Sequence, residues 1–161
     1  MKRSSVALAA VCLVLIAMPV AASAAPSTSK SFTYHLVEKQ VAFNFIDNPP
    51  RQGSNEPPLV GDQFAFSSDL LTRSGAHAGS LGATCTVTQG GIHTSGPCYG
   101  IFALKGGQLM AMARFTFSNA PSEVVIVGGT GVYRGATGYV TSVSRGEDSA
   151  YSDDTFHIQL P

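Results

Sequence analysis

The sequence predicts an all-β domain of about eight short strands, and three observations lead to this prediction. After residue 31, no window shows the 3.6-residue period of an amphipathic helix, whereas several alternate apolar and polar residues with a period of two. Glycine-bearing turn signals separate these segments. The chain has 161 residues, enough for one domain. Regular short strands with glycine-rich turns are typical of a barrel or a sandwich, and the pattern alone does not separate the two.

The first 24 residues are expected to be a secretory signal peptide. Lys2 and Arg3 form a positive start, the run from Val6 to Val20 carries no charge, and an Ala-Ser-Ala cleavage site ends at Ala24. Fifteen apolar residues are too few to span a bilayer. We therefore expect an exported, extracellular protein, with a flexible lead-in at 25–31 and the folded domain at 32–161.

The expected strands differ in how clearly they alternate. Segment 154–160 places Phe156, Ile158 and Leu160 on one face, and segment 108–117 alternates from Leu109 to Phe117. Gly106-Gly107, between two apolar segments, is a two-residue hairpin signal. In chain order the expected strands are 40–46, 61–67, 82–88, 98–104, 108–117, 123–128, 137–144 and 154–160.

Cys85 and Cys98 are expected to form a disulfide. Cleavage of the signal peptide removes Cys12, so three cysteines become two, and these lie near the ends of two expected strands. In an exported protein such a pair usually forms a disulfide. A catalytic thiol is the alternative, although neither cysteine has a basic neighbour in the sequence.

Charge excludes several classes of function. The chain has 10 Lys and Arg against 10 Asp and Glu, and loss of Lys2 and Arg3 leaves a net charge of −2. Without a basic cluster, nucleic-acid binding is not expected.

No metal-ligand spacing, serine-hydrolase motif or complete phosphate-binding loop occurs, so no cofactor is expected. The acidic residues Glu147, Asp148, Asp153 and Asp154 are interpreted as a solvated strand connection.

Residues 123–139, EVVIVGGTGVYRGATGY, resemble the signature of the dirigent and allene oxide cyclase barrel superfamily. The segments GDQFAFSSDLL and GSLGATCTVT are similar to the cyclase side, and FNFIDNPP, which contains Asp47, is similar to the first dirigent strand. Together these matches cover about residues 40–145. Arg134 matches the first arginine of the dirigent motif, whereas Thr137 stands at the second.

This resemblance implies an eight-stranded antiparallel barrel with an apolar pocket, usually trimeric. Allene oxide cyclases guide cyclisation of an unsaturated epoxide, and dirigent proteins position radicals or quinone methides for stereoselective coupling. Neither needs a cofactor. Cys85 aligns with a pocket-lining cysteine of the cyclases, while their acidic residue on the first strand aligns near Phe43.

Asp47 and Arg134 are the candidate catalytic residues. The Asp47 carboxylate, at the end of an apolar strand, can protonate or stabilise a cationic intermediate, or it can begin a turn instead. Arg134 can hold an anionic oxygen, or it can be a solvated surface residue. The candidate substrate-binding residues are Tyr133, Phe45, Tyr34 and His35.

Three functions follow as hypotheses. The first is an exported barrel that binds an apolar small molecule and steers its cyclisation, isomerisation or coupling. Whether it is an enzyme stays open; if so, it is a cofactor-independent isomerase or cyclase. The second is a lipocalin-like carrier that catalyses no reaction, and the third is a structural surface protein. In each case a homotrimer is possible.

Overall fold

The computed structural model describes residues 29–49, 57–116, 120–146 and 149–161. The expected signal peptide at 1–24 and most of the expected lead-in lie outside the described residues. Within the described ranges, no helix is both long enough and apolar enough to cross a membrane.

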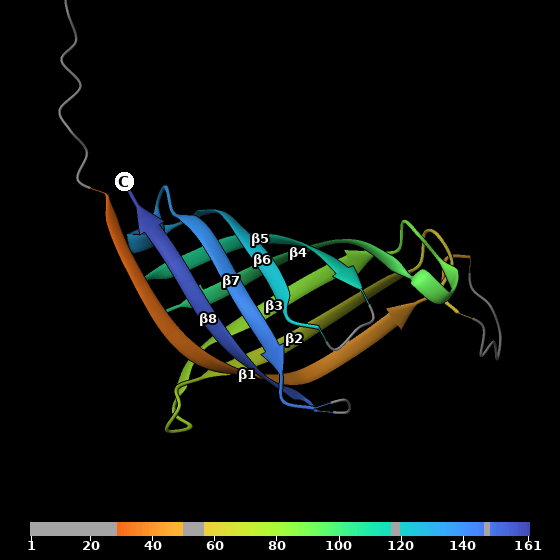
Figure 1. Ribbon diagram of the computed structural model, residues 1–161, viewed down its shortest axis with the longest axis horizontal. Coiled ribbons are helices and arrows are strands. Elements are labelled where there is room, and N and C mark those ends of the chain that lie inside the picture. The colour runs from red at the N-terminus through yellow and green to blue at the C-terminus, as the bar shows by residue number, and fades with distance from the viewer. Residues whose placement is uncertain (1–28, 50–56, 117–119, 147–148) are drawn as a thin grey trace, which may run out of the picture.

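Eight antiparallel strands form one closed barrel, in which each strand pairs with the next and β8 pairs with β1 (Figure 1). This confirms the expected barrel and excludes a sandwich. Two single-turn 3₁₀ helices, η1 (Gly91–His93) and η2 (Gly131–Tyr133), lie between strands. The strands are β1 (Lys30–Ile46), β2 (Gln63–Leu71), β3 (His77–Thr86), β4 (Ser95–Leu104), β5 (Gly107–Thr116), β6 (Ser122–Gly129), β7 (Thr137–Ser144) and β8 (Tyr151–Leu160).

Strand β1 is longer than expected, because it begins at Lys30 rather than at residue 40. Its first part pairs with β8 and its second part with β2, so it curves along the whole barrel (Figure 1). The register shifts between Gln40 and Ala42. Glu38 and Gln40 occupy inward positions in the middle of this strand, and these polar residues interrupt the alternation that would have revealed its full length.

The apolar core fills one end of the barrel, which we call the closed end. Inward residues of β1, β2, β3, β4, β5, β6, β7 and β8 meet there with Ala136, which follows η2. The most deeply buried large side chains are Phe156, Leu70, Leu109 and Ile158. Phe156 stacks on Tyr34 with ring centroids 4.7 Å apart and meets Phe102 edge-on at 5.0 Å. These rings separate the closed end from the remaining interior.

The hairpin between β4 and β5 turns one residue earlier than expected. Leu104 pairs with Gly107, so Lys105 and Gly106 form the turn, and Gly106 has a φ of +94°. Gly131, in the GGTG run, has a φ of +60° and lies against this hairpin. A Cβ atom on Gly131 would come within 2.1 Å of the Gly106 carbonyl oxygen, so only glycine fits there.

The expected disulfide between Cys85 and Cys98 is present. The two cysteines lie directly opposite each other on β3 and β4, and Cys85 is buried. The disulfide therefore joins two strands that already pair within the barrel wall.

We expect the Cys85→Ser/Cys98→Ser double variant to lose about 3 kcal/mol of unfolding free energy, because the disulfide closes a loop with a sequence separation of 13 in the unfolded chain. Urea unfolding at neutral pH measures the loss. Reductant should lower the midpoint of the wild type to that of the double variant, and leave the variant unchanged. Equal midpoints for oxidised wild type and variant would contradict this expectation.

Candidate functional site

The half of the barrel that the core leaves unfilled contains a cavity of about 500 Å³. Exposed residues such as Thr116, Glu123 and Ser144 lie at its edge, and we call this the open end of the barrel. The walls are mainly apolar and aromatic, and the disulfide forms part of them. The apolar lining includes Phe64, Phe66, Leu81, Ala83, Phe102, Ala111, Ala113, Phe115, Val124 and Val140.

Two carboxylic acids, Glu38 on β1 and Asp154 on β8, face this cavity side by side. The Ser68 hydroxyl donates a hydrogen bond of 2.6 Å to Glu38 Oε1. The Ser152 hydroxyl donates one of 3.1 Å to Asp154 Oδ1. Asp154 is only 2% exposed. The cavity thus has a polar wall along β7, β8 and β1, opposite the apolar side chains of β2, β3, β4 and β5.

Burial and neighbouring groups change the acidity of both carboxyl groups. The pKa of Glu38 is raised to about 7, first by burial and then by the charge of Asp154, while hydrogen bonds from Ser68 and Ser152 act to lower it. Burial likewise raises the pKa of Asp154, against hydrogen bonds from Ser142, Ser152 and Glu38 that lower it. Near neutral pH the pair therefore titrates as one unit that can hold or release a proton inside the cavity.

Sequence reasoning missed both acids. Asp154 was expected in a solvated acidic connection, and this expectation is wrong, because β8 begins at Tyr151 and turns Asp154 inward. Its neighbour Asp153 does face solvent, where it pairs with Arg145 at 2.6 Å. For both residues the two-residue period of a strand was a signal that the side chain points inward. Glu38 is two residues after Leu36, Asp154 is two residues before Phe156, and Leu36 and Phe156 are both buried.

The sequence-based candidates Asp47 and Phe45 lie at the open end of the barrel. Phe45 pairs across the sheet with Phe64, a cavity-lining residue, and is itself 38% exposed. Asp47 directly follows β1, and the next residue, Asn48, donates its backbone N–H to the buried carboxylate of Asp62 at 2.9 Å. Asp62 also accepts the backbone N–H of Leu59 at 2.7 Å, which ties the loop after β1 to β2. Neither Asp47 nor Phe45 is among the cavity-lining residues.

The other candidates lie at or near the closed end. Arg134 is exposed directly after η2, and Tyr133 donates its hydroxyl to the Lys105 carbonyl at 3.4 Å. Tyr34 points inward, behind the cavity floor; its hydroxyl is buried, and burial followed by the neighbouring Tyr133 hydroxyl raises its pKa. His35 points outward and hydrogen-bonds Thr155 at 2.9 Å. The structure thus places Asp47 and Arg134 far apart in the barrel, and their catalytic roles stay predictions.

Fold and site together define a class: an eight-stranded barrel with a ligand-sized interior cavity, aromatic walls and a buried acid pair. Among the described residues, no group of three or more His, Cys, Asp or Glu is placed to hold a metal ion.

Solved structures of the same fold include dirigent proteins and cyclase barrels. The pterocarpan synthase dirigent protein GePTS1 is 17% identical, with a TM-score of 0.66 over 87% of this chain and 97% of its own. A pyocyanin demethylase is 24% identical, with a TM-score of 0.65 over 79% of this chain and 99% of its own. The exo-specific intermolecular Diels-Alderase AbnU is 15% identical, with a TM-score of 0.62 over 83% and 100%. No family model and no curated protein matches the chain.

These similarities confirm, at the level of the fold, the resemblance seen in residues 123–139. The identities are too low to carry residue roles across.

We expect Glu38→Gln to change the pH dependence of stability. Because the pKa of Glu38 is raised to about 7 in the folded state, the folded protein binds this proton more tightly than the unfolded chain does. The contribution of Glu38 to the unfolding free energy therefore falls as pH rises from about 4.5 to about 7, by up to about 3 kcal/mol. Glu38→Gln should remove this fall, as measured by urea unfolding between pH 4.5 and 8.

Glu123→Gln serves as the control, since Glu123 lines the same cavity at its exposed edge. This variant should keep the pH profile of the wild type. Parallel profiles for wild type and Glu38→Gln would show that Glu38 ionises as freely in the folded protein as in the unfolded chain.

Proposed function

We propose that this protein is an exported barrel that binds an apolar small molecule and steers its cyclisation, isomerisation or stereoselective coupling. The observation that carries the proposal is the cavity of about 500 Å³, preformed within a closed barrel and walled by aromatic and aliphatic side chains. A rigid pocket of this kind holds a reactive molecule in one conformer, so a reaction that is fast in solution proceeds to one product. The dirigent proteins and the Diels-Alderase among its structural neighbours support this general kind of function.

The acid pair gives the cavity a group that can act on an intermediate. A carboxylic acid that titrates near neutral pH can donate a proton to a developing alkoxide or phenolate, and its carboxylate can stabilise a developing cation. Glu38 and Asp154 offer this chemistry inside the cavity, whereas Asp47 is the candidate from sequence at the open end.

The principal test uses a quinone methide or an unsaturated epoxide that closes spontaneously to a racemate. Wild type should give an enantiomeric excess, measured by chiral chromatography. Ala113→Phe, which adds a ring inside the cavity, should abolish it, because the substrate no longer fits. Ala42→Phe, on the outward face of β1, should keep it.

The outcomes separate the three functions. Racemic product from a protein that still binds the substrate would identify a carrier. If no apolar molecule binds, the structural role is the one of the three functions that remains. If product selectivity survives in Glu38→Gln and Asp154→Asn but is lost in Asp47→Asn or Arg134→Gln, the sequence-based candidates carry the chemistry.

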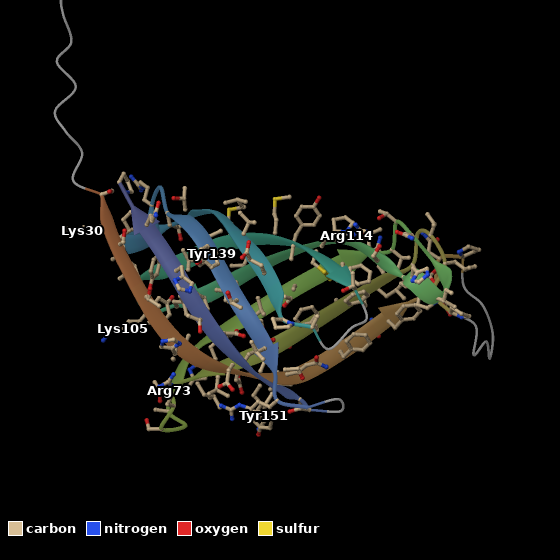
Figure 2. The ribbon with its side chains drawn as sticks, viewed as in Figure 1. Lys30, Arg73, Lys105, Arg114, Tyr139 and Tyr151 are labelled. Atoms are coloured by element: carbon tan, nitrogen blue, oxygen red, sulfur yellow. A yellow bond between two sulfur atoms is a disulfide. The ribbon has the colours of Figure 1, made fainter. Side chains whose placement is uncertain are left out.

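We also propose that the barrel associates with copies of itself, with the homotrimer suggested by the sequence resemblance as the expected state. The outer wall of β4, β5, β6 and β7 carries a continuous group of exposed apolar side chains, which we call the outer stripe; Figure 2 shows Tyr139 on it. Cross-strand pairs connect Tyr99 to Met112, Met112 to Val125, and Val125 to Tyr139. An exposed apolar surface that crosses four neighbouring strands is typical of a protein interface. Its members are Tyr99, Ile101, Met110, Met112, Val125, Val127 and Tyr139.

We expect Val125→Glu to dissociate the assembly, because it places a charge at the centre of the outer stripe. Sedimentation equilibrium should give three copies for the wild type and one for the variant. Val60→Glu, in an exposed loop away from the stripe, should leave the mass unchanged. A wild type that sediments as a single chain would contradict self-association.

A further inference from the structure

The cavity carries an uneven distribution of charge. Its ionisable lining residues among those described are Glu38 on β1, Asp154 on β8, Glu123 on β6 and Arg114 on β5. The described lining residues of β2, β3, β4 and β7 add none, because both cysteines are in the disulfide. The described lining of the cavity therefore has three acidic residues and one basic residue.

The single base does not neutralise the acid pair. Arg114 shares the outward face of β5 with Met110 and Met112, and Figure 2 shows it near the end of the barrel at which β4 begins. Its guanidinium donates hydrogen bonds to Ser95 Oγ at 2.9 Å and Gln89 Oε1 at 3.2 Å. Among the described residues, the groups that shift the pKa of Glu38 and of Asp154 are hydroxyls and other carboxyl groups. The acid pair thus has no positive side chain as a partner within the described part of the cavity.

Two hydroxyl groups stabilise the charged form of the acid pair against the burial that disfavours it. Ser68 and Ser152 direct their hydroxyl protons at Glu38 and Asp154, an arrangement that stabilises carboxylates. On the other side, Phe64 and Phe66 belong to the apolar wall of the cavity. In such surroundings a cation interacts with a carboxylate much more strongly than it does in water.

Resting on the proposed function of this same cavity, we propose that the barrel selects apolar ligands that carry a basic nitrogen. The protonated nitrogen binds between Glu38 and Asp154, and the apolar body of the ligand lies against the aromatic wall. A ligand that places a carboxylate in the same position is rejected, because it adds a negative charge beside two buried acids that no positive side chain neutralises in the described part of the cavity. The selectivity thus comes from the acid pair, and the capacity for apolar molecules comes from the walls.

The test compares three probes with one apolar body and different polar groups: naphthylethylamine, naphthylethanol and naphthylacetate. Isothermal titration calorimetry of the purified protein at pH 6.5 measures each affinity. We expect the amine to bind at least about tenfold more tightly than the alcohol, and the carboxylate at least about tenfold more weakly, the size of effect that one additional charge interaction of about 1.4 kcal/mol produces.

A second measurement determines how many protons the protein releases when a probe binds. Titration in two buffers of different ionisation enthalpy should show that the wild type releases a fraction of a proton when the amine binds, because the ammonium displaces the proton held by Glu38 and Asp154. The alcohol should release none. A structural role for the pair would not produce this release.

Glu38→Gln and Asp154→Asn should each remove the preference for the amine over the alcohol and the proton release. Asp69→Asn, which removes a partly exposed carboxylate on the outward face of β2, is the matched control and should keep both. Two variants are used so that misfolding of one, detected by circular dichroism, leaves the other to decide. If both misfold, the three probe affinities and the proton count of the wild type decide.

The outcomes also separate this inference from the proposed function. If the alcohol binds and the amine has no advantage, or if the carboxylate binds as tightly as the amine, the inference is overturned and the cavity remains a binding site. If none of the three probes binds, the proposed function fails together with it. Amine preference that persists unchanged in both Glu38→Gln and Asp154→Asn would overturn the assignment to the acid pair.

Discussion

The closure of β8 on β1 is the constraint on which the rest of this structure depends. Ten residue pairs join the two strands, from Lys30 with Leu160 to Lys39 with Tyr151. Closure leaves no unpaired edge in this sheet and gives every strand an inside and an outside. It also determines the position of the polar groups, because Glu38 and Asp154 come from opposite ends of the described chain and face one cavity only where these two strands meet.

The interior of the barrel has two parts, a packed core at the closed end and a cavity toward the open end. At the closed end, stacked rings such as Tyr34 and Phe156 fill the space and bury apolar area. Toward the open end the inward positions alternate between large rings and small residues such as Ala83 and Ala113, and the space they leave becomes the cavity. Burying two acids beside this space costs stability, a cost typical of functional sites. On the opposite face the same alternation leaves the apolar side chains of the outer stripe exposed.

Much of the fold could be predicted from the sequence, because strand alternation and turn glycines are local properties. Segment 154–160 was recognised by Phe156 and Ile158, and the GGTG run by its glycines, of which Gly131 does need a positive φ. The site was predicted less well. Asp47 was the predicted carboxylate because it follows an apolar strand, whereas the buried acids that line the cavity, Glu38 and Asp154, are in strand interiors, where they interrupt the apolar alternation.

By itself, the sequence determined the fold class and the positions of most strands, since these depend on residues near one another in the chain. It also predicted the pairing of Cys85 with Cys98, on the expectation that Cys12 is lost with a signal peptide. Only the tertiary structure decided which polar residues face the same cavity. Whether Asp154 is solvated or buried depends on a strand register set by β1 and β7, on both sides of β8. One residue of register separates Asp153, which pairs with Arg145 in solvent, from Asp154, which faces the cavity with Glu38.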